Sequence, residues 1–121
     1  MARYEEAAYW NSLIRMSLSR FFILRVLKQR PMYGYEITER VKEATGGCCA
    51  PTEGTIYPVL RELEDGGYVD GHPEVVFGRE RRVYTLTEKG QQAYDVAAST
   101  WYGAASIVMR SVQGETVWVE D

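Results

Sequence analysis

Three arginines within four residues form the part of this chain best suited to bind an anion. They stand in the segment FGRERRVY as Arg79, Arg81 and Arg82, among residues with β-propensity. Because side chains alternate across an extended strand, Arg79 and Arg81 should lie on one face, and Glu80 and Arg82 on the other. At least part of the group must then project outward. Charged runs are most often solvated surfaces, so the segment alone favours nucleic acid only modestly.

A second group of polar side chains stands at the start of the segment EGTIYPVLRELEDGG. Pro58 lacks an amide hydrogen and is tolerated only near a helix start, which predicts that this helix begins within a few residues of Gly54. Small or hydroxyl side chains and free backbone amides in its first turn would let a phosphate approach. The residues that could donate hydrogen bonds or reach a phosphate or guanine are Thr52, Thr55, Tyr57 and Arg61. A solvated helix face is the alternative for Tyr57 and Arg61.

Few residues of the sequence could form a metal, disulfide or catalytic site. Cys48 and Cys49 are adjacent, so a disulfide between them would be strained, and structural zinc sites usually space their cysteines two to four residues apart. We expect a loop thiol pair without metal, and a surface position for the lone His72. Ser/His/Asp groups, Gly-rich phosphate loops and helical His pairs are missing from the sequence, so we expect neither enzymatic activity nor a cofactor.

The elements that must position these groups are helices followed by a hairpin. Helix-forming residues from about Glu5 to Lys28 carry too many apolar side chains for one stripe, which predicts one long helix or two abutting helices, largely buried. A turn at Pro31 and a second helix ending at Gly46 and Gly47 follow. The third helix is EGTIYPVLRELED, with an apolar stripe of Ile56, Val59, Leu60 and Leu63. The β-prone stretches Tyr68–Val69 and Arg82–Leu86 then predict the hairpin.

Helix, helix, helix and hairpin is the order of a winged helix, in which the third helix can enter the DNA major groove. The predicted fold class is therefore mainly α with a small β-hairpin: a winged helix-turn-helix plus a C-terminal dimerisation helix. We expect a DNA-binding domain over residues 1–86, the dimerisation helix over 87–114 and a tail over 115–121. In this context the arginines of the hairpin make DNA a better explanation than a solvated surface.

The last helix, from the N-cap Thr87 to about Gln113, has the cleanest apolar repeat. Its members alternate steps of four and three residues, the mean spacing of a coiled-coil seam: Tyr94, Ala98, Trp101, Ala105, Val108 and Val112. The seam could pack on its own domain, but the chain has no further element to cover it. We therefore expect a second copy of the chain as its partner, in a homodimer.

Charge and hydropathy restrict the partners and the cellular location expected for the protein. A net charge of -3 argues against a nonspecific nucleic-acid coat, although a local basic site is compatible with it. The apolar run Phe21–Leu24 is too short to span a bilayer, and the acidic N-terminus MARYEEAAYW does not resemble a signal peptide. The sequence predicts a cytoplasmic protein without a membrane partner.

Three segments resemble the signature blocks of the PadR family of transcriptional regulators: YGYEI, EGTIYPVLRELEDGGYV and RRVYTLTEKG. They stand in the family's order and spacing within Phe21–Tyr94. The resemblance implies a dimeric winged-helix protein, usually a repressor, that binds near-palindromic operators. The single C-terminal helix resembles that of the smaller subgroup, in which the first and last helices make the dimer, and adds Tyr9, Trp10 and Leu13 to the expected interface.

The resemblance also assigns roles by position. Tyr33 and Tyr35 match paired tyrosines at the start of the second helix, the first of which can meet phosphate. The start of the recognition helix is matched by Glu53, Gly54, Thr55, Tyr57 and Pro58, and the basic pair of the wing by Arg81 and Arg82. One segment departs from the family: Phe77–Glu80 forms the turn, where relatives often have a longer run of small or proline residues.

Aromatic side chains gather in the two segments expected to form the dimer. They could be interface packing, since Trp and Tyr are enriched at interfaces, or they could line a ligand pocket. Some members of the family bind planar aromatic or lipophilic compounds between the subunits, against a tryptophan of the last helix. The residues expected to meet such an effector are Trp10, Trp101 and Tyr102. The alternative function is a winged-helix module whose basic wing binds an acidic protein.

Overall fold

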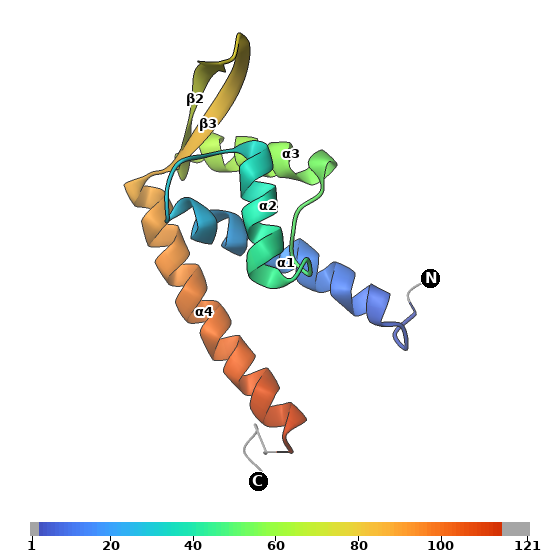
Figure 1. Cartoon of the computed structure of the whole chain (residues 1–121). Helices are drawn as coiled ribbons and strands as arrows, with labels where there is room; N and C mark the ends of the chain where they lie inside the picture. The colour runs from blue at the N-terminus through green and yellow to red at the C-terminus, as the bar shows by residue number, and fades with distance from the viewer. Residues whose placement is uncertain (1–2, 115–121) are drawn as a thin grey trace.

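The computed structural model describes residues 3–114 and contains four helices and a three-stranded sheet (Figure 1). The helices are α1 (Ala7–Leu27), α2 (Gly34–Thr45), α3 (Glu53–Asp65) and α4 (Glu88–Val112). The strands β1 (Met32–Tyr33), β2 (Val69–Val76) and β3 (Arg79–Leu86) are antiparallel in the order β1-β3-β2. This arrangement confirms the predicted fold class, while the predicted tail, 115–121, lies outside the described residues.

The core lies where the C-terminal half of α1 meets α2, α3 and the base of the hairpin. Its buried members are Ile23, Leu24, Val26, Leu27, Met32, Ile37, Val41, Ile56, Val59, Leu60, Leu63, Val69 and Tyr84. The predicted apolar stripe of α3 is confirmed, because all four of its members are in this cluster. The opposite face of α3 is left exposed on the outside of the molecule.

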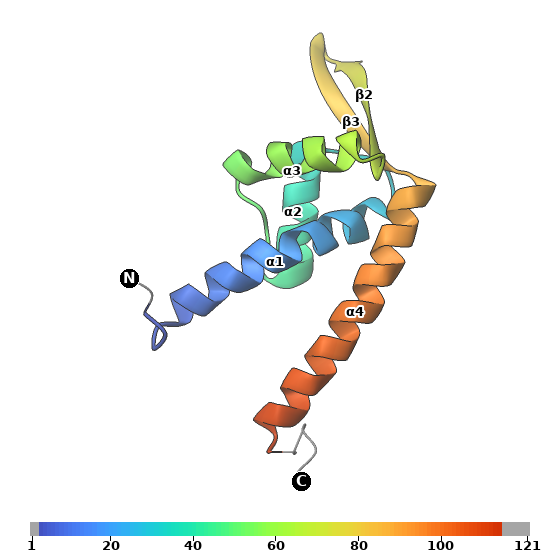
Figure 2. The same ribbon diagram turned by 180° about the vertical axis from the view of Figure 1, so that it is seen from behind.

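The first helix is continuous, but the prediction that it is largely buried is wrong for its N-terminal half. There Trp10 is 50% and Met16 65% exposed, whereas Ile23 is completely buried. The first turns of this half extend away from the body (Figure 2), while Met16 lines one pocket together with Thr55 at the start of α3. Apolar residues alone could not reveal that only half of the helix reaches the core.

The hairpin is longer than predicted, and strand β1 was not predicted. Register pairs run from Val69 with Leu86 to Val76 with Arg79, so the polar segment between the predicted stretches belongs to the strands. Most of its side chains are exposed, which removes the apolar alternation that marks a half-buried strand. Pro73 is tolerated because β2 is an edge strand.

The predicted helix ends agree with the structure. Gly46, at φ 63°, and Gly67, at φ 81°, follow α2 and α3, and the hydroxyl of the N-cap Thr87 accepts a bond from the Gly90 amide at 3.0 Å. Helix α3 begins at Glu53, close to Gly54 as predicted, but Pro58 is its sixth residue. The reason given for that start is therefore wrong. An amide hydrogen at position 58 would bond to the Gly54 carbonyl within the helix. Pro58 has no amide hydrogen, so the Gly54 carbonyl lacks this donor.

Helix α4 is fixed to the body near its start and then diverges from α1. The Tyr94 ring stacks on Phe21 of the same chain, with centroids 5.4 Å apart, and the Lys28 ammonium lies 5.0 Å from the Tyr94 centroid. Beyond this contact the C-terminal half of α4 and the N-terminal half of α1 form two separate arms (Figures 1 and 2). None of the helices in residues 3–114 has the length and apolar character needed to cross a membrane.

Candidate nucleic-acid interface

The start of α2, the exposed face of α3 and the wing enclose one open depression of about 520 Å³. All but Gly34 and Glu80 of its lining residues are sequence-predicted DNA-binding residues. The full lining is Tyr33, Gly34, Tyr35, Tyr57, Arg79, Glu80, Arg81 and Arg82. Arg61 lies beside it, in an adjoining depression that also includes Tyr57 and Arg82. The structure thus brings together residues from three segments of the sequence on one surface.

The two tyrosines at the start of α2 are arranged around Arg81 of the wing. Their rings are nearly parallel, at 4°, with centroids 6.5 Å apart. The Arg81 guanidinium lies 5.7 Å from the Tyr33 centroid and 5.6 Å from that of Tyr35, within cation–π distance of both. The side chain of Arg81 is therefore oriented by α2 and is not freely solvated.

Tyr33 also connects α2 with the neighbouring strand. Its hydroxyl donates to a carboxylate oxygen of Glu74 at 3.1 Å, and Glu74 stands opposite Arg81 in the register of β2 and β3. Burial and this hydrogen bond raise the pKa of Tyr33, so its phenol stays protonated at neutral pH. The backbone amide of Tyr33 donates to Glu36 at 3.1 Å, which caps the first turn of α2.

Tyr57 joins α3 to α2 through a close contact with Gly34. A Cβ at Gly34 would lie 2.7 Å from Cε1 of the Tyr57 ring, so only glycine permits this approach. The Tyr57 side chain nevertheless remains 52% exposed. The ring is therefore positioned by α2 and still exposes part of its surface, so the predicted contact with DNA is sterically open.

Arg82 points to the other face of the wing, which confirms the predicted alternation. Its guanidinium donates to Glu64 of α3 at 2.5 Å and crosses Gly71, where a Cβ would lie 2.6 Å from Nε of Arg82. The hydrogen bond to Glu64 and its negative charge raise the pKa of Arg82. Arg82 thus connects the wing to α3, a role that its sequence-based assignment to the basic pair of the wing did not include.

Two predicted arginines differ from Arg81 and Arg82 in having no partner. Arg61 and Arg79 are exposed, and neither forms an ion pair, hydrogen bond or cation–π contact with the rest of residues 3–114. They come from α3 and from the first position of β3, on either side of the Tyr57 region. These two guanidinium groups are available for phosphate or base contacts.

The start of α3 offers fewer free donors than predicted. The amides of Thr55 and Ile56 both donate to the Thr52 carbonyl, at 3.0 and 2.9 Å, and the hydroxyls of Thr52 and Thr55 bond to each other at 2.8 Å. Thr52 is the N-cap by position, although its side chain makes no capping bond. Glu53, in the same turn, adds a negative charge that opposes the approach of a phosphate.

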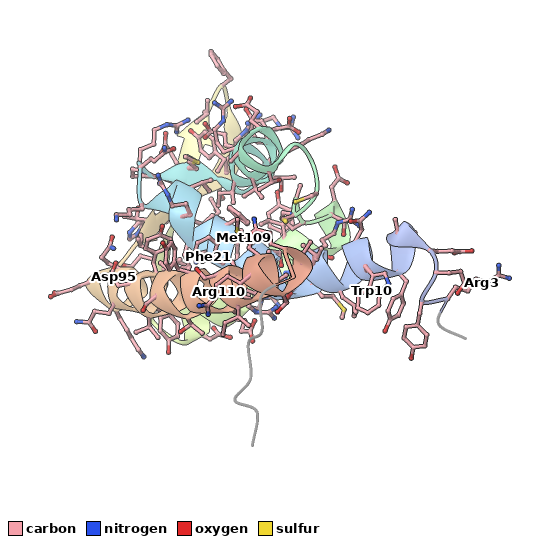
Figure 3. The ribbon with its side chains drawn as sticks, turned by 90° about the horizontal axis from the view of Figure 1, so that it is seen from below. Arg3, Trp10, Phe21, Asp95, Met109 and Arg110 are labelled. Carbon is pink, nitrogen blue, oxygen red and sulfur yellow. The ribbon has the colours of Figure 1, made fainter. Side chains whose placement is uncertain are left out.

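The residues predicted for the dimer and the effector lie on the two arms. Trp10 donates its indole N–H to the Tyr4 carbonyl at 2.7 Å and contacts Tyr9 edge to face, near the end of α1 labelled in Figure 3. Trp101 and Tyr102 are on α4, so one chain alone does not bring them to Trp10. Among the seam residues, Tyr94 packs on its own chain through Phe21, while Ala105, Val108 and Val112 are exposed.

Sequence reasoning missed Glu64, Glu74 and the close contact at Gly34. The two carboxylates were not singled out, because finding a partner on another element requires knowledge of the hairpin register. One signal was present: Glu74 and Arg81 have opposite charges at positions equally distant from the turn, which favours this register. The glycine between two tyrosines was a second signal, since close approach is a common reason for glycine in a helix.

Comparison with known proteins identifies the family. The model of the "Transcriptional regulator PadR-like family" matches residues 23–96, which is more than half of the chain. The chain belongs to this family of transcriptional regulators. It is 32% identical, over 78 residues, to the negative transcriptional regulator PadR of Bacillus subtilis strain 168. That match covers 64% of this chain and 43% of the longer Bacillus protein.

Solved structures of PadR-like proteins share the fold. A PadR-like transcriptional regulator from Bacillus cereus strain ATCC 14579 superposes with a TM-score of 0.73 at 24% identity, over 85% of this chain and 99% of the other. Bacillus subtilis PadR in complex with operator DNA gives a TM-score of 0.61 at 30% identity, over 65% of this chain and 45% of that one. Members of a family of transcriptional regulators are not enzymes, which agrees with the sequence-based expectation.

Proposed function

We propose that this PadR-family regulator is a homodimeric repressor that binds operator DNA through α3 and the wing. The observation that carries the proposal is that Arg61 and Arg79, which have no partner among the described residues, share one surface with the exposed edge of Tyr57. A recognition helix in the major groove with basic side chains at its flanks is the usual geometry of helix-turn-helix proteins. The similar Bacillus subtilis PadR has been solved with operator DNA, which supports the same ligand here.

In this proposal the four arginines of this surface have two different roles, supported by which of them have partners within the chain. Arg61 and Arg79 contact DNA directly, whereas Arg81 and Arg82 are held by Tyr33, Tyr35 and Glu64 and fix the wing. Each phosphate contact releases counterions, so losing one contact lowers the salt slope of binding by about one unit. Arg61→Ala and Arg79→Ala should each weaken binding in this way.

Fluorescence anisotropy with a duplex from the region upstream of the chain's own gene tests these roles. Arg110→Ala is the matched control, because Arg110 lies near the end of α4, remote from the wing (Figures 1 and 3). It should keep the wild-type salt slope in a dimeric protein. Wild-type affinity and slope in both Arg61→Ala and Arg79→Ala would refute the proposed surface.

Glu64→Ala separates the two possible roles of Arg82. If Arg82 positions the wing through Glu64, removing the carboxylate should weaken operator binding as Arg82→Ala does. If Arg82 instead contacts phosphate, removal of its competing acid should strengthen binding. Higher operator affinity in Glu64→Ala would therefore contradict the positioning role.

The homodimer is supported by apolar surface on both arms. Trp10 and Met16 on α1 and Tyr102, Val108 and Met109 on α4 are each at least half exposed in the single chain. Large exposed patches of this kind mark interaction surfaces in soluble proteins, and association of the arms of two chains would cover them. The dimer sets the separation of two recognition helices, which must match half-sites about one DNA turn apart.

Ala105→Glu tests the dimer without disturbing the fold of the chain. Ala105 is exposed in the single chain, so a charge there is tolerated by a monomer but would be buried without a partner in the proposed seam. Light scattering should find a folded monomer for the variant and a dimer for the wild type, with loss of operator binding. A wild-type monomer at micromolar concentration would refute the seam.

A small aromatic or lipophilic effector is the proposed release signal, bound between the subunits against Trp101, with Trp10 and Tyr102 nearby. Small seam residues beside the large indole leave room for a planar ligand, and a change in the separation of the arms would alter operator affinity. Quenching of tryptophan fluorescence in wild type and Trp101→Phe, with operator release followed in parallel, tests it. Equal quenching in both proteins, or binding without release, would contradict it.

A winged-helix module that binds an acidic protein is the alternative. It accounts for the same exposed arginines, but it predicts no preference for the upstream duplex over an unrelated duplex of equal length. Competition between the two duplexes at fixed salt decides between the functions.

A further inference from the structure

Phe77 stands at the tip of the wing in a conformation that bulky residues seldom adopt. Val76 pairs with Arg79, so Phe77 and Gly78 alone form the turn of the hairpin, and the prediction that the turn extends over Phe77–Glu80 is wrong. Their φ angles are 50° and 74°, which is the positive-φ pair of a type I′ turn. Such turns favour Asn-Gly and Asp-Gly, because a bulky side chain is strained in the left-handed region.

Folding of the chain does not explain a phenylalanine at this position. Its side chain is 99% exposed, so it gains nothing from burial within the described part of the chain. The residue therefore carries two costs: backbone strain and an apolar ring in water. Residues held in such strained conformations cluster at active sites, ligand contacts and switch regions.

The surroundings of Phe77 indicate what that partner is. The turn lies at the end of the hairpin that projects beyond α3, away from the arms (Figure 1). Arg79 follows the turn without an ion-pair partner in residues 3–114, and Val75, before it, is 72% exposed. The tip thus combines an apolar ring with a free guanidinium. Glu80, one residue later, falls on the strand face opposite Arg79.

We propose that Phe77 is an apolar wedge that enters the minor groove of DNA beside the major-groove site of α3. The inference rests on the proposed operator binding. With α3 in the major groove, the wing tip reaches the adjacent minor groove, where Arg79 meets the negative potential of the narrow groove. Apolar wedges of this kind separate neighbouring base pairs and bend the duplex, most readily at pyrimidine–purine steps. The ring, covered by bases, then offsets the strain of its turn.

The wedge makes stability and binding respond in opposite directions to one substitution. Phe77→Asn places a residue that tolerates positive φ in the turn, so thermal unfolding should shift to higher temperature. The same variant loses the ring and should bind the upstream duplex about tenfold more weakly. Phe77→Leu is the matched control: it keeps an apolar wedge and should retain affinity within about threefold of wild type.

A fluorescent base provides a readout that a weakened fold would not imitate. Single 2-aminopurine substitutions are placed in turn at the A·T pairs flanking the half-site, and fluorescence is measured at saturating protein. Wild type and Phe77→Leu should raise the emission at one flanking step through unstacking, and Phe77→Asn should not. Emission that rises equally with Phe77→Asn, or wild-type operator affinity in that variant, overturns the wedge and leaves Phe77 as a contact for a protein.

The same titrations distinguish failure of the wedge from failure of the operator proposal. If wild type binds neither the upstream nor an unrelated duplex, both proposals fall. If wild type binds the operator and Phe77→Asn binds equally well, only the wedge falls. Anisotropy at protein saturation, reached for each variant, keeps the fluorescence comparison independent of affinity.

Discussion

Gly90 in the first turn of α4 is the position where one added methyl group should be most damaging. A Cβ there would lie 2.1 Å from the Tyr68 carbonyl oxygen and 2.6 Å from Cδ1 of Leu86. The Tyr68 carbonyl is held in place, since it accepts the Thr87 amide at 3.2 Å where α4 begins. The clash is with backbone and cannot be relieved by rotation of a side chain, so Gly90→Ala must displace α4 or the turn after α3.

The magnitude follows from two opposing effects. Overpacking of a tight contact costs about 1–3 kcal/mol, and the severity of this contact favours the upper end. Replacing glycine by alanine within a helix stabilises the helix by about 1 kcal/mol. Gly90→Ala should therefore destabilise the fold by about 2 kcal/mol, which lowers Tm by roughly 6–10 °C for a chain of this size.

Gly103→Ala is the matched control in the same helix. Nothing lies within 4 Å of a Cβ at Gly103, so only the gain in helix propensity remains, and Tm should rise. Circular dichroism during heating, at one protein concentration for all proteins, measures both shifts. A Gly90→Ala variant as stable as Gly103→Ala would refute the reasoning, because it would show that α4 adjusts freely at its start.

The remaining predictions concern the thiol pair and the contact between α2 and α3. At pH 8 iodoacetamide should alkylate the exposed Cys48 and spare the buried Cys49 in the folded protein. The reason is that burial and the hydrogen bond with Cys48 raise the pKa of Cys49 to about 12. Peptide mass spectrometry that found both cysteines alkylated would contradict this prediction. Gly34→Ala should destabilise the fold by about 1 kcal/mol in the wild type but not in a Tyr57→Ala background, since the ring is what the new Cβ meets. Additive losses in that double-mutant cycle would argue against the contact.

The sequence predicted the elements that are set by local chemistry. The ends of α2, α3 and α4 follow from glycines and a threonine cap, whose conformational preferences depend on a few neighbouring residues. The buried stripe of α3 follows from helical periodicity. The paired tyrosines were assigned through the resemblance to the PadR family, and the wing arginines were found as a cluster of like charges in a β-prone segment.

Features that depend on the distance between elements could not be predicted in this way. Strand β1 has only two residues and exists because it pairs with β3, from Met32 with Tyr84 to Tyr33 with Val83. Whether an arginine of the wing is free or paired depends on which acid of α3 faces it, and α3 contains four acids. Helix α1 is buried only in its C-terminal half, where the other elements pack against it. The periodicity of its own sequence does not encode how far this packing extends.

Three glycines show how the exposed interface is held in place. Gly34 receives the Tyr57 ring, Gly71 lies under the Arg82 side chain, and Gly90 lies against the Tyr68 carbonyl. Each contact joins two elements that carry or support the proposed DNA-binding surface. Among the side chains proposed to meet DNA, Tyr57 can remain 52% exposed because its position is set by the contact with the Gly34 backbone and not by burial of its own atoms. Substitution at these glycines should therefore reduce operator binding through displaced neighbours, even though none of the three has a side chain to contact DNA.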